Sequence, residues 1–273
     1  MSDFLKKRAN EAFIIIGVLF TFLPETIFEN LNIFNRIKNN DIRITAVRIL
    51  VYLIILIIIS IICLIYLKAR TKVTIKNRNY HIQIQYGDIF QLQNCRKVIS
   101  FDECFTTDVG DEPYKIKPNS ICGQYLTRNS SINISTLIQR NGISQAPTTS
   151  NYQSKVRYES GTIVPNNDFL LMAFAKLDNY GLGHMSRKEY LDCLSLMWEE
   201  IDKYYAQKDI CIPILGSGIT RTGDGVNLTQ QELLDLIILS YKLSNNKIKL
   251  PNKLIIVCRK NDDFSLNNIG ESL

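Results

Sequence analysis

Residues 209–225 read DICIPILGSGITRTGDG, and the fold class follows from this segment more than from any other. Up to Leu215 the segment is almost entirely apolar, which predicts a buried strand. A glycine-rich turn follows, and Thr229 with Glu232 then forms a capping box that predicts a helix through about Leu243. A strand, a turn and a helix in this order are a building unit of α/β domains.

The same patterns place further elements on both sides of this unit. Ser186 and Glu189 form another capping box, which predicts a helix over 186–207. Residues 106–151 contain many glycines and prolines and are predicted to form loops, with one amphipathic helix near 134–140. Alternating or continuous apolar runs predict strands at 72–85, 97–101, 155–164, 169–177 and 252–258. Together these elements predict a three-layer α/β fold, a mixed sheet with helices on both faces.

An apolar segment near the N-terminus predicts a helix that spans a membrane. Residues 49–67, ILVYLIILIIISIICLIYL, carry no charged side chain over nineteen positions. As a helix they would extend about 28 Å, close to the thickness of the hydrocarbon core of a bilayer. A buried core helix would carry a polar stripe, whereas lipid requires every backbone polar group to be paired internally. We therefore predict a spanning helix at about 46–67.

A second apolar run lies upstream, at 12–28. Its uncharged part, AFIIIGVLFTFL, is short, so it either spans with help from a partner helix or lies at the membrane interface. A signal peptide is a further alternative because the basic residues 6–8 precede the run, but the following TFLPET offers no small-x-small cleavage site. We expect two N-terminal transmembrane helices within 1–70 and a soluble domain over 71–273.

The charge distribution predicts an orientation and excludes one class of partner. The first 70 residues hold nine basic and five acidic side chains, and the remaining 203 hold 23 and 21, so the larger domain offers no strongly basic surface for nucleic acid. With two spans, most of the flanking basic residues lie on the side of both termini, which predicts a multi-pass cell-membrane protein with a cytoplasmic C-terminal domain. The seven cysteines form no C-x-x-C pair, which favours reduced thiols in the cytosol.

The glycine-rich turn is the strongest candidate binding element. A turn from a strand into a helix exposes backbone N–H groups, and glycines let an anion approach without interference from a Cβ atom. Two nucleotide-binding motifs nevertheless fail here. Asp224 stands where a Walker A motif needs lysine, and Arg221 replaces the third glycine of G-x-G-x-x-G. The turn is therefore either an anion-binding loop, which Arg221 favours, or a plain flexible connection.

A second candidate lies at the end of the first long strand, where Gly87, Asp88 and Ile89 follow one another. A carboxylate at a strand end can accept hydrogen bonds from an exocyclic amine such as that of adenine, although Gly-Asp is also a common turn sequence. This Gly-Asp-Ile sequence, with Ile-Pro-x-x-Gly-Ser-Gly-Ile at 212–219, resembles the macro domains, which bind ADP-ribose. The resemblance implies that Asp88 reads adenine and that the turn from Gly216 wraps the diphosphate.

The sequence departs from the macro-domain pattern in two places. FDECFTT at 101–107 replaces the usual asparagine-rich stretch, and the three-glycine first loop is reduced to SICG at 120–123. Both changes affect the end of the site that hydrolase members use, so the resemblance favours a receptor over an enzyme. Asp102 and Glu103 could form an acid–base pair, but adjacent strand positions face opposite ways.

The whole chain resembles the membrane-anchored macro-domain effectors of the Thoeris anti-phage systems, through its N-terminal apolar segments, the loop NYGLG at 179–183 and the turn at 216–225. In that family, a TIR-domain partner makes an ADP-ribose-derived signal, histidine-ADP-ribose in this branch. The effector binds the signal and the cell membrane fails, so the infected cell dies. The resemblance implies a homo-oligomeric effector that is not an enzyme, with no catalytic residue, no metal and no cofactor.

The resemblance also implies a set of ligand-binding residues in the two loops and in the reduced first loop. They are Asp88, Ile89, Ser120, Gly123, Gly216, Ser217, Gly218, Ile219, Thr220 and Arg221. Two alternative functions stay open: a membrane-tethered ADP-ribosyl hydrolase or other nucleotide-processing enzyme, and a structural adaptor whose macro-like fold is empty.

Overall fold

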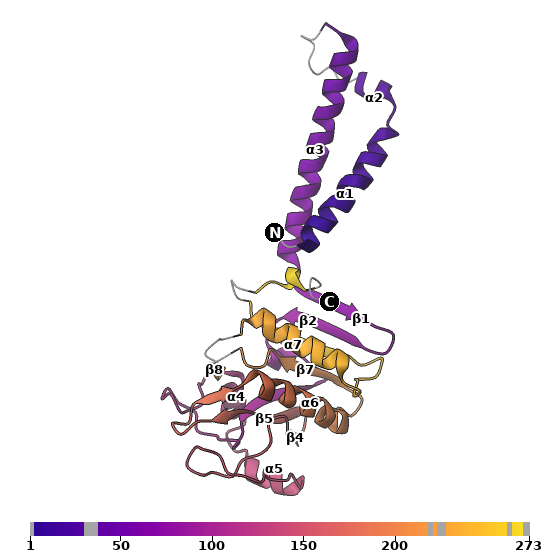
Figure 1. Ribbon diagram of the computed structural model, residues 1–273. Helices are drawn as coiled ribbons and strands as arrows, with labels where there is room; N and C mark the ends of the chain where they lie inside the picture. Colours follow the sequence, from indigo (N-terminus) through magenta and orange to yellow (C-terminus); the bar gives the residue numbers. More distant parts are fainter. Residues whose placement is uncertain (1–2, 30–37, 218–220, 223–227, 261–263, 270–273) are drawn as a thin grey trace. The chain divides into compact units, whose positions relative to one another are not determined.

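A computed structural model describes residues 3–29, 38–217, 221–222, 228–260 and 264–269 of the chain. The chain divides into two units, Met1–Thr71 together with Leu266–Leu273, and Lys72–Ser265. The first unit is helical, and the second contains the sheet (Figure 1).

The first unit holds the apolar helix that the sequence predicts. Among the described residues, α3 (Asn40–Ala69) is the one helix long and apolar enough to cross a membrane. It begins ahead of the predicted residue 46, because the side chain of Asn39 accepts hydrogen bonds from the backbone N–H groups of Asp41 and Ile42 and so caps an earlier turn.

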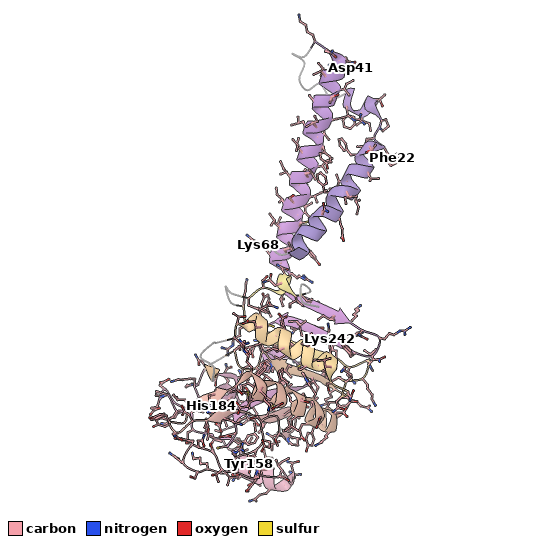
Figure 2. The ribbon with its side chains drawn as sticks, in the orientation of Figure 1. Phe22, Asp41, Lys68, Tyr158, His184 and Lys242 are labelled. Atoms are coloured by element: carbon pink, nitrogen blue, oxygen red, sulfur yellow. The ribbon has the colours of Figure 1, made fainter. Side chains whose placement is uncertain are left out.

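The predicted helix over 12–28 is wrong as a single element. The structure has α1 (Asp3–Thr21) and α2 (Glu25–Glu29), separated by a non-helical link that contains Pro24. Proline is tolerated in the first turn of a helix but not in its interior. One helix therefore ends before Pro24 and a new helix starts after it. Phe22, in this link, is 81% exposed (Figure 2). α1 carries five charged residues in its first nine positions, and a pair of transmembrane helices is not confirmed.

Aromatic side chains join the helices within this unit. Phe13 and Phe20 of α1 lie edge-on to Tyr52 of α3, with ring centroids 6.0 and 5.4 Å apart. Phe28 of α2 is buried beside Phe20, and the guanidinium of Arg48 stands 5.2 Å from the centroid of the Phe28 ring. Arg48 also donates a hydrogen bond to a backbone carbonyl of the link (3.4 Å). These contacts make α1 and α3 a hairpin (Figure 1).

The second unit is built on a mixed sheet of nine described strands, in the order β1-β2-β9-β7-β3-β5-β6-β8, with β4 paired to β5. β2, β9, β7, β3 and β5 are parallel, so their carboxyl ends meet at one edge. The outer strand β1 exposes Lys72, Thr74 and Lys76. The bounds are β1 Lys72–Lys76, β2 His81–Tyr86, β3 Cys95–Asp102, β4 Ile163–Asn166, β5 Phe169–Leu177, β6 Gly183–Met185, β7 Asp209–Pro213, β8 Arg221–Thr222 and β9 Leu254–Cys258.

Helices cover both faces of this sheet. Ile99 and Phe101 of β3 pack in one cluster with Tyr125 of α4. Phe174 of β5 instead contacts Tyr190 of α6, with ring centroids 6.0 Å apart, and α7 lies beside α6 (Figure 1). Phe101 pairs with Ala173 of β5, so Phe174, the next residue along β5, faces the other side of the sheet. The predicted three-layer α/β arrangement with a mixed sheet is therefore confirmed. The helices are α4 Ile121–Arg128, α5 Ile134–Arg140, α6 Arg187–Tyr204 and α7 Gln230–Leu243, with 3-10 turns η1 Ile89–Gln91 and η2 Leu266–Asn268.

The single tryptophan links the two helices of one layer. Trp198 of α6 is 1% exposed, and its Nε1–H donates to the hydroxyl of Ser240 on α7 (3.0 Å). Its ring lies 4.8 Å from that of Tyr241, centroid to centroid. Both helices begin with the capping boxes that the sequence predicts, at Ser186 and Thr229.

Three other predictions need correction. The strand predicted at 72–85 is the hairpin β1–β2, because the chain turns back where the N–H of Asn77 donates to the carbonyl of Tyr80 (3.0 Å). Of the strand predicted at 155–164, residues 155–158 bond to segments outside the strands, and only Gly161 and Thr162, just before β4, bond to β5. The segment 106–151, predicted to be mostly loop, contains α4 as well as the expected α5.

Candidate ligand-binding site

A cavity of about 700 Å³ runs along the carboxyl edge of the parallel strands. Residues at or just beyond the ends of β2, β9, β7, β3 and β5 line it, together with the first turns of α4 and α7. Neighbouring strands are about 4.8 Å apart, so five strand ends extend over about 19 Å. In open α/β sheets this edge is the usual place for a ligand.

Asp88 lies at the β2 end of the cavity. Its Oδ1 accepts a hydrogen bond from the backbone N–H of Phe90 (2.9 Å), which caps the short helix η1. Oδ2 of Asp88 makes no hydrogen bond within the described part of the chain, so it can accept one from a ligand. Ile89 also lines the cavity but is 3% exposed and packs with Cys95 and Cys211, which anchors the turn beneath Asp88.

The turn after β7 contributes Gly216 and Ser217 to the cavity. Gly216 has φ +80°, a conformation that favours glycine, and the hydroxyl of Ser217 donates to the carbonyl of Ile214 (2.9 Å). The hydroxyl of Tyr190 donates to the carbonyl of Leu215 (3.1 Å) and ties the start of the turn to α6.

The predicted site continues through the next four residues of the sequence. Gly218, Ile219 and Thr220 lie outside the described residues. Arg221 forms β8 with Thr222, which pairs in parallel with β6. The backbone position of Arg221 is therefore described, and its part in ligand binding stays a prediction.

Ser120 and Gly123, predicted together, are placed differently. Ser120 lines the cavity and caps α4, because its Oγ accepts from the N–H of Gly123 (3.0 Å) and donates to the carbonyl of Lys117 (2.7 Å). Gly123 is not among the lining residues of the cavity. A Cβ atom there would lie 2.2 Å from the carbonyl oxygen of Lys117, so glycine lets α4 approach the segment before it.

Asp102 and Glu103 lie next to each other at the end of β3, but their carboxyl groups have different surroundings. Asp102 lines the cavity, and burial raises the pKa of its carboxyl group against the hydrogen bonds that it accepts from Thr106 and Cys104. Glu103 is 2% exposed and accepts from the N–H of Leu177 (3.2 Å), with Arg157 3.5 Å away on its other oxygen. The two carboxyl groups therefore do not form an acid–base pair.

Sequence reasoning missed several cavity residues. Lys115 and Lys117 line it from the segment before α4, and Arg259 lines it from the end of β9. A basic residue directly after the last predicted strand was the available signal for Arg259. Cys122 also lines the cavity, and burial raises the pKa of its thiol, which opposes a role as a thiolate nucleophile. Within the described residues, no group of three or more His, Cys, Asp or Glu side chains is placed to hold a metal ion.

An α/β unit with a ligand-sized cavity at the carboxyl ends of its parallel strands belongs to the class of ligand-binding α/β domains. Residues 82–259 match the family described as "Thoeris protein ThsA, Macro domain". The chain is also 32% identical over 234 residues to the Thoeris protein ThsA of Bacillus amyloliquefaciens (strain Y2), covering 80% of this chain and 77% of that protein. The chain belongs to the Thoeris ThsA family with a macro domain, a family of anti-phage defence.

Solved macrodomains are also similar to this chain. The Oceanobacillus iheyensis macrodomain with ADP has 11% sequence identity and a TM-score of 0.44, covering 70% of this chain and 90% of that one. The macrodomain of Thermus aquaticus DarG has 13% identity and a TM-score of 0.38, covering 66% of this chain and 98% of that one. The family assignment rests on the family match and on the Bacillus relative.

Proposed function

We propose that this chain is a membrane-anchored defence effector whose cavity binds an ADP-ribose-derived signal. The observation that carries the proposal is the course of the cavity across five parallel strand ends, with Asp88 at one end and Gly216 near the middle. Its volume of about 700 Å³ suits a small-molecule ligand. A length of about 19 Å suits an extended molecule of two nucleoside-like halves.

The strand order supports one direction for the ligand. The base lies beyond β2, where Oδ2 of Asp88 accepts a hydrogen bond from its exocyclic amine. The diphosphate lies beyond β7, against the backbone around Gly216, where glycine permits close approach. The distal group lies beyond β3 and β5, near Asp102. Histidine-ADP-ribose, made by a TIR-domain partner, is the signal that we propose.

The membrane part of the proposal assigns α3 as the anchor. We propose that the apolar half of α1 enters the membrane beside α3, that the sheet domain is cytoplasmic, and that the signal favours a homo-oligomer that disrupts the bilayer. The ring contacts of Phe20 and Phe28 with their neighbours support a packed helical hairpin. The signal can drive assembly only if it binds the assembled state more tightly than the resting one.

Calorimetry of the full chain in detergent tests the ligand, using ADP-ribose and its histidine and imidazole conjugates. In Asp88→Asn, Oδ1 can still accept from Phe90 while an amide N–H₂ replaces the oxygen that we assign to the base. Since hydrogen bonds to charged groups contribute about 1.5–3 kcal/mol, affinity should fall about 10- to 100-fold.

The matched control is Asp178→Asn. Oδ1 of Asp178 accepts from the N–H groups of Tyr180 and Leu182 (both 2.8 Å), and Asp178 is not a lining residue of the cavity. This variant should bind as the natural chain does. Equal affinity in Asp88→Asn would remove Asp88 from the site, and no binding of any of the three compounds would overturn the proposed ligand. Chromatography after incubation should return the ligand intact, whereas its consumption would favour the hydrolase alternative.

A further inference from the structure

Arg259 occupies a distinctive position in the cavity. It directly follows β9, which lies between β2 and β7 in the sheet. Asp88 directly follows the turn after β2, and the N–H of Gly87 donates to the carbonyl of Cys258 (3.2 Å), so these two strand ends are adjacent. Gly216 stands beyond the other neighbour, β7. Arg259 is therefore between the carboxylate that we assign to the base and the turn that we assign to the diphosphate.

The two lysines that line the cavity from the segment before α4 already have partners in the protein. The ammonium of Lys115 pairs with Glu112 (2.9 Å), and that of Lys117 donates to the backbone carbonyls of Asp111 and Glu112. Both lysines that line the cavity from this segment therefore have partners in the protein. Hydrogen bonds to neighbouring oxygen atoms hold their ammonium groups in place.

The guanidinium of Arg259 is engaged much less. Its Nη2 donates to the backbone carbonyl of Asn119 at 3.3 Å, a long hydrogen bond, and no carboxylate of the described residues pairs with it. A guanidinium has five N–H donors in a planar fork, so four remain for a ligand. The carbonyl of Arg259 accepts a hydrogen bond from Nε2 of Gln230 at the start of α7 (3.2 Å), which links the residue to that helix. A planar fork with most of its N–H groups available suits a phosphate group.

We infer that Arg259 binds a phosphate of the ligand, the one nearer to the base. This inference rests on the proposed function and adds a charged side chain to a site otherwise assigned to backbone groups. The fork reaches the phosphate from β9 while the amides around Gly216 approach from β7. The bond to Asn119 either stays on one N–H group or is exchanged for the phosphate oxygens.

Binding by Arg259→Gln in the full chain tests the inference, with ADP-ribose and adenosine as the two probes. The variant should bind ADP-ribose about 10- to 100-fold more weakly, because a charge-assisted pair is lost. Adenosine, which has no phosphate, should bind both proteins within about twofold, since the base contacts are unchanged. Arg259→Lys should recover part of the loss because it keeps the charge without the fork.

A salt series provides a second readout. Screening weakens an exposed ion pair, so raising the salt concentration should reduce the affinity of the natural chain for ADP-ribose more than that of Arg259→Gln. The matched control is Arg140→Gln, an exposed arginine at the end of α5 that is not a lining residue of the cavity, and it should behave as the natural chain.

Each outcome separates the two proposals. If the natural chain binds ADP-ribose and Arg259→Gln binds it equally well with the same salt dependence, the inference fails and the proposed function stands. An equal loss for adenosine and ADP-ribose would assign Arg259 to the base or to positioning, which also overturns the inference. If adenosine binds too weakly to measure, an unchanged salt dependence in the variant overturns it. If the natural chain binds only a conjugate of ADP-ribose, that conjugate replaces ADP-ribose as the probe. If it binds neither ADP-ribose nor its histidine and imidazole conjugates, both proposals fail.

Discussion

At position 123 the backbone of α4 comes so close to the preceding segment that glycine alone fits. An added Cβ atom would lie 2.2 Å from the carbonyl oxygen of Lys117 and 3.0 Å from Cα of Pro118, and both are backbone atoms that cannot move aside freely. The ligand contact that the sequence predicts at Gly123 stays a prediction, and the structure shows a packing reason for glycine there. Two glycines in predicted loops can have different uses, and sequence alone does not separate them.

Gly123→Ala should therefore destabilise the sheet unit. Overpacking of this kind costs about 1–3 kcal/mol, and thermal unfolding followed by the emission of Trp198 should show a lower midpoint. Gly17→Ala is the control, because nothing lies within 4 Å of a Cβ atom at that helical position. It should leave the Trp198 transition unchanged. An unaltered midpoint in Gly123→Ala would mean that α4 can shift at little cost.

The positions of single residues also explain why the candidate site was predicted only in part. Asp88 and Gly216, far apart in sequence, line one cavity, as the two loop motifs implied. Asp102 and Arg259 were not among the predicted site residues. A position at a strand end places a residue near the edge of the sheet but does not determine the direction of its side chain. Their orientation follows from burial and from neighbouring loops, which depend on the completed fold.

At the scale of elements, the first turn of α6 contains a carboxyl group, that of Glu189, whose pKa is strongly lowered. Partial burial would raise the pKa of Glu189, but hydrogen bonds from Lys176 and Ser186 outweigh it and lower the pKa to about 2. Nζ of Lys176 lies 2.6 Å from Oε1, and the N–H of Ser186 donates to Oε2 (2.7 Å). The carboxylate thus closes the capping box and joins β5 to α6.

The pH dependence of stability follows from this lowered pKa. A carboxyl group with a pKa depressed from 4.5 in the unfolded chain to about 2 contributes stability above pH 4.5 and loses it as the pH falls towards 2. Between pH 5 and 3, urea unfolding should show a smaller loss of stability in Glu189→Gln than in the natural chain. Glu199→Gln, an exposed carboxylate on the same helix, is the control. Equal losses in all three proteins would contradict the prediction.

Elements with chemical start signals were predicted best. Ser186 and Thr229 mark α6 and α7 through hydrogen bonds that are local in sequence, and the structure confirms both capping boxes. Strands were predicted less well, because pairing is not local. The run 72–85 was predicted as one strand although its alternation breaks at the polar residues 76–79, where the turn at Asn77–Tyr80 divides it into a hairpin. α4 was missed because the prolines and glycines around it dominate the pattern.

At the scale of the whole molecule, the two units should unfold separately. The chain has one tryptophan, Trp198, which is buried between α6 and α7 in the unit Lys72–Ser265. In detergent, guanidinium should shift the emission of Trp198 while far-UV circular dichroism keeps the helical signal of α1 and α3. The reason is that helices in an apolar medium retain their internal hydrogen bonds.

The comparison of the two signals provides the check. Circular dichroism should change in two steps, the first coincident with the tryptophan shift. A single transition shared by both signals would mean that the units fold as one cooperative body. The wider architecture was predictable because layers follow from apolar periodicity, whereas the break between α1 and α2 depended on one proline.

The lysines of β1 restrict how two copies of the sheet unit can meet. If the outer strand paired antiparallel with its counterpart about Thr74, Lys72 of each copy would face Lys76 of the other, and like charges opposite one another oppose pairing. A continuous intermolecular ladder is therefore disfavoured along this border. An assembly through helices or loops would avoid these opposed charges.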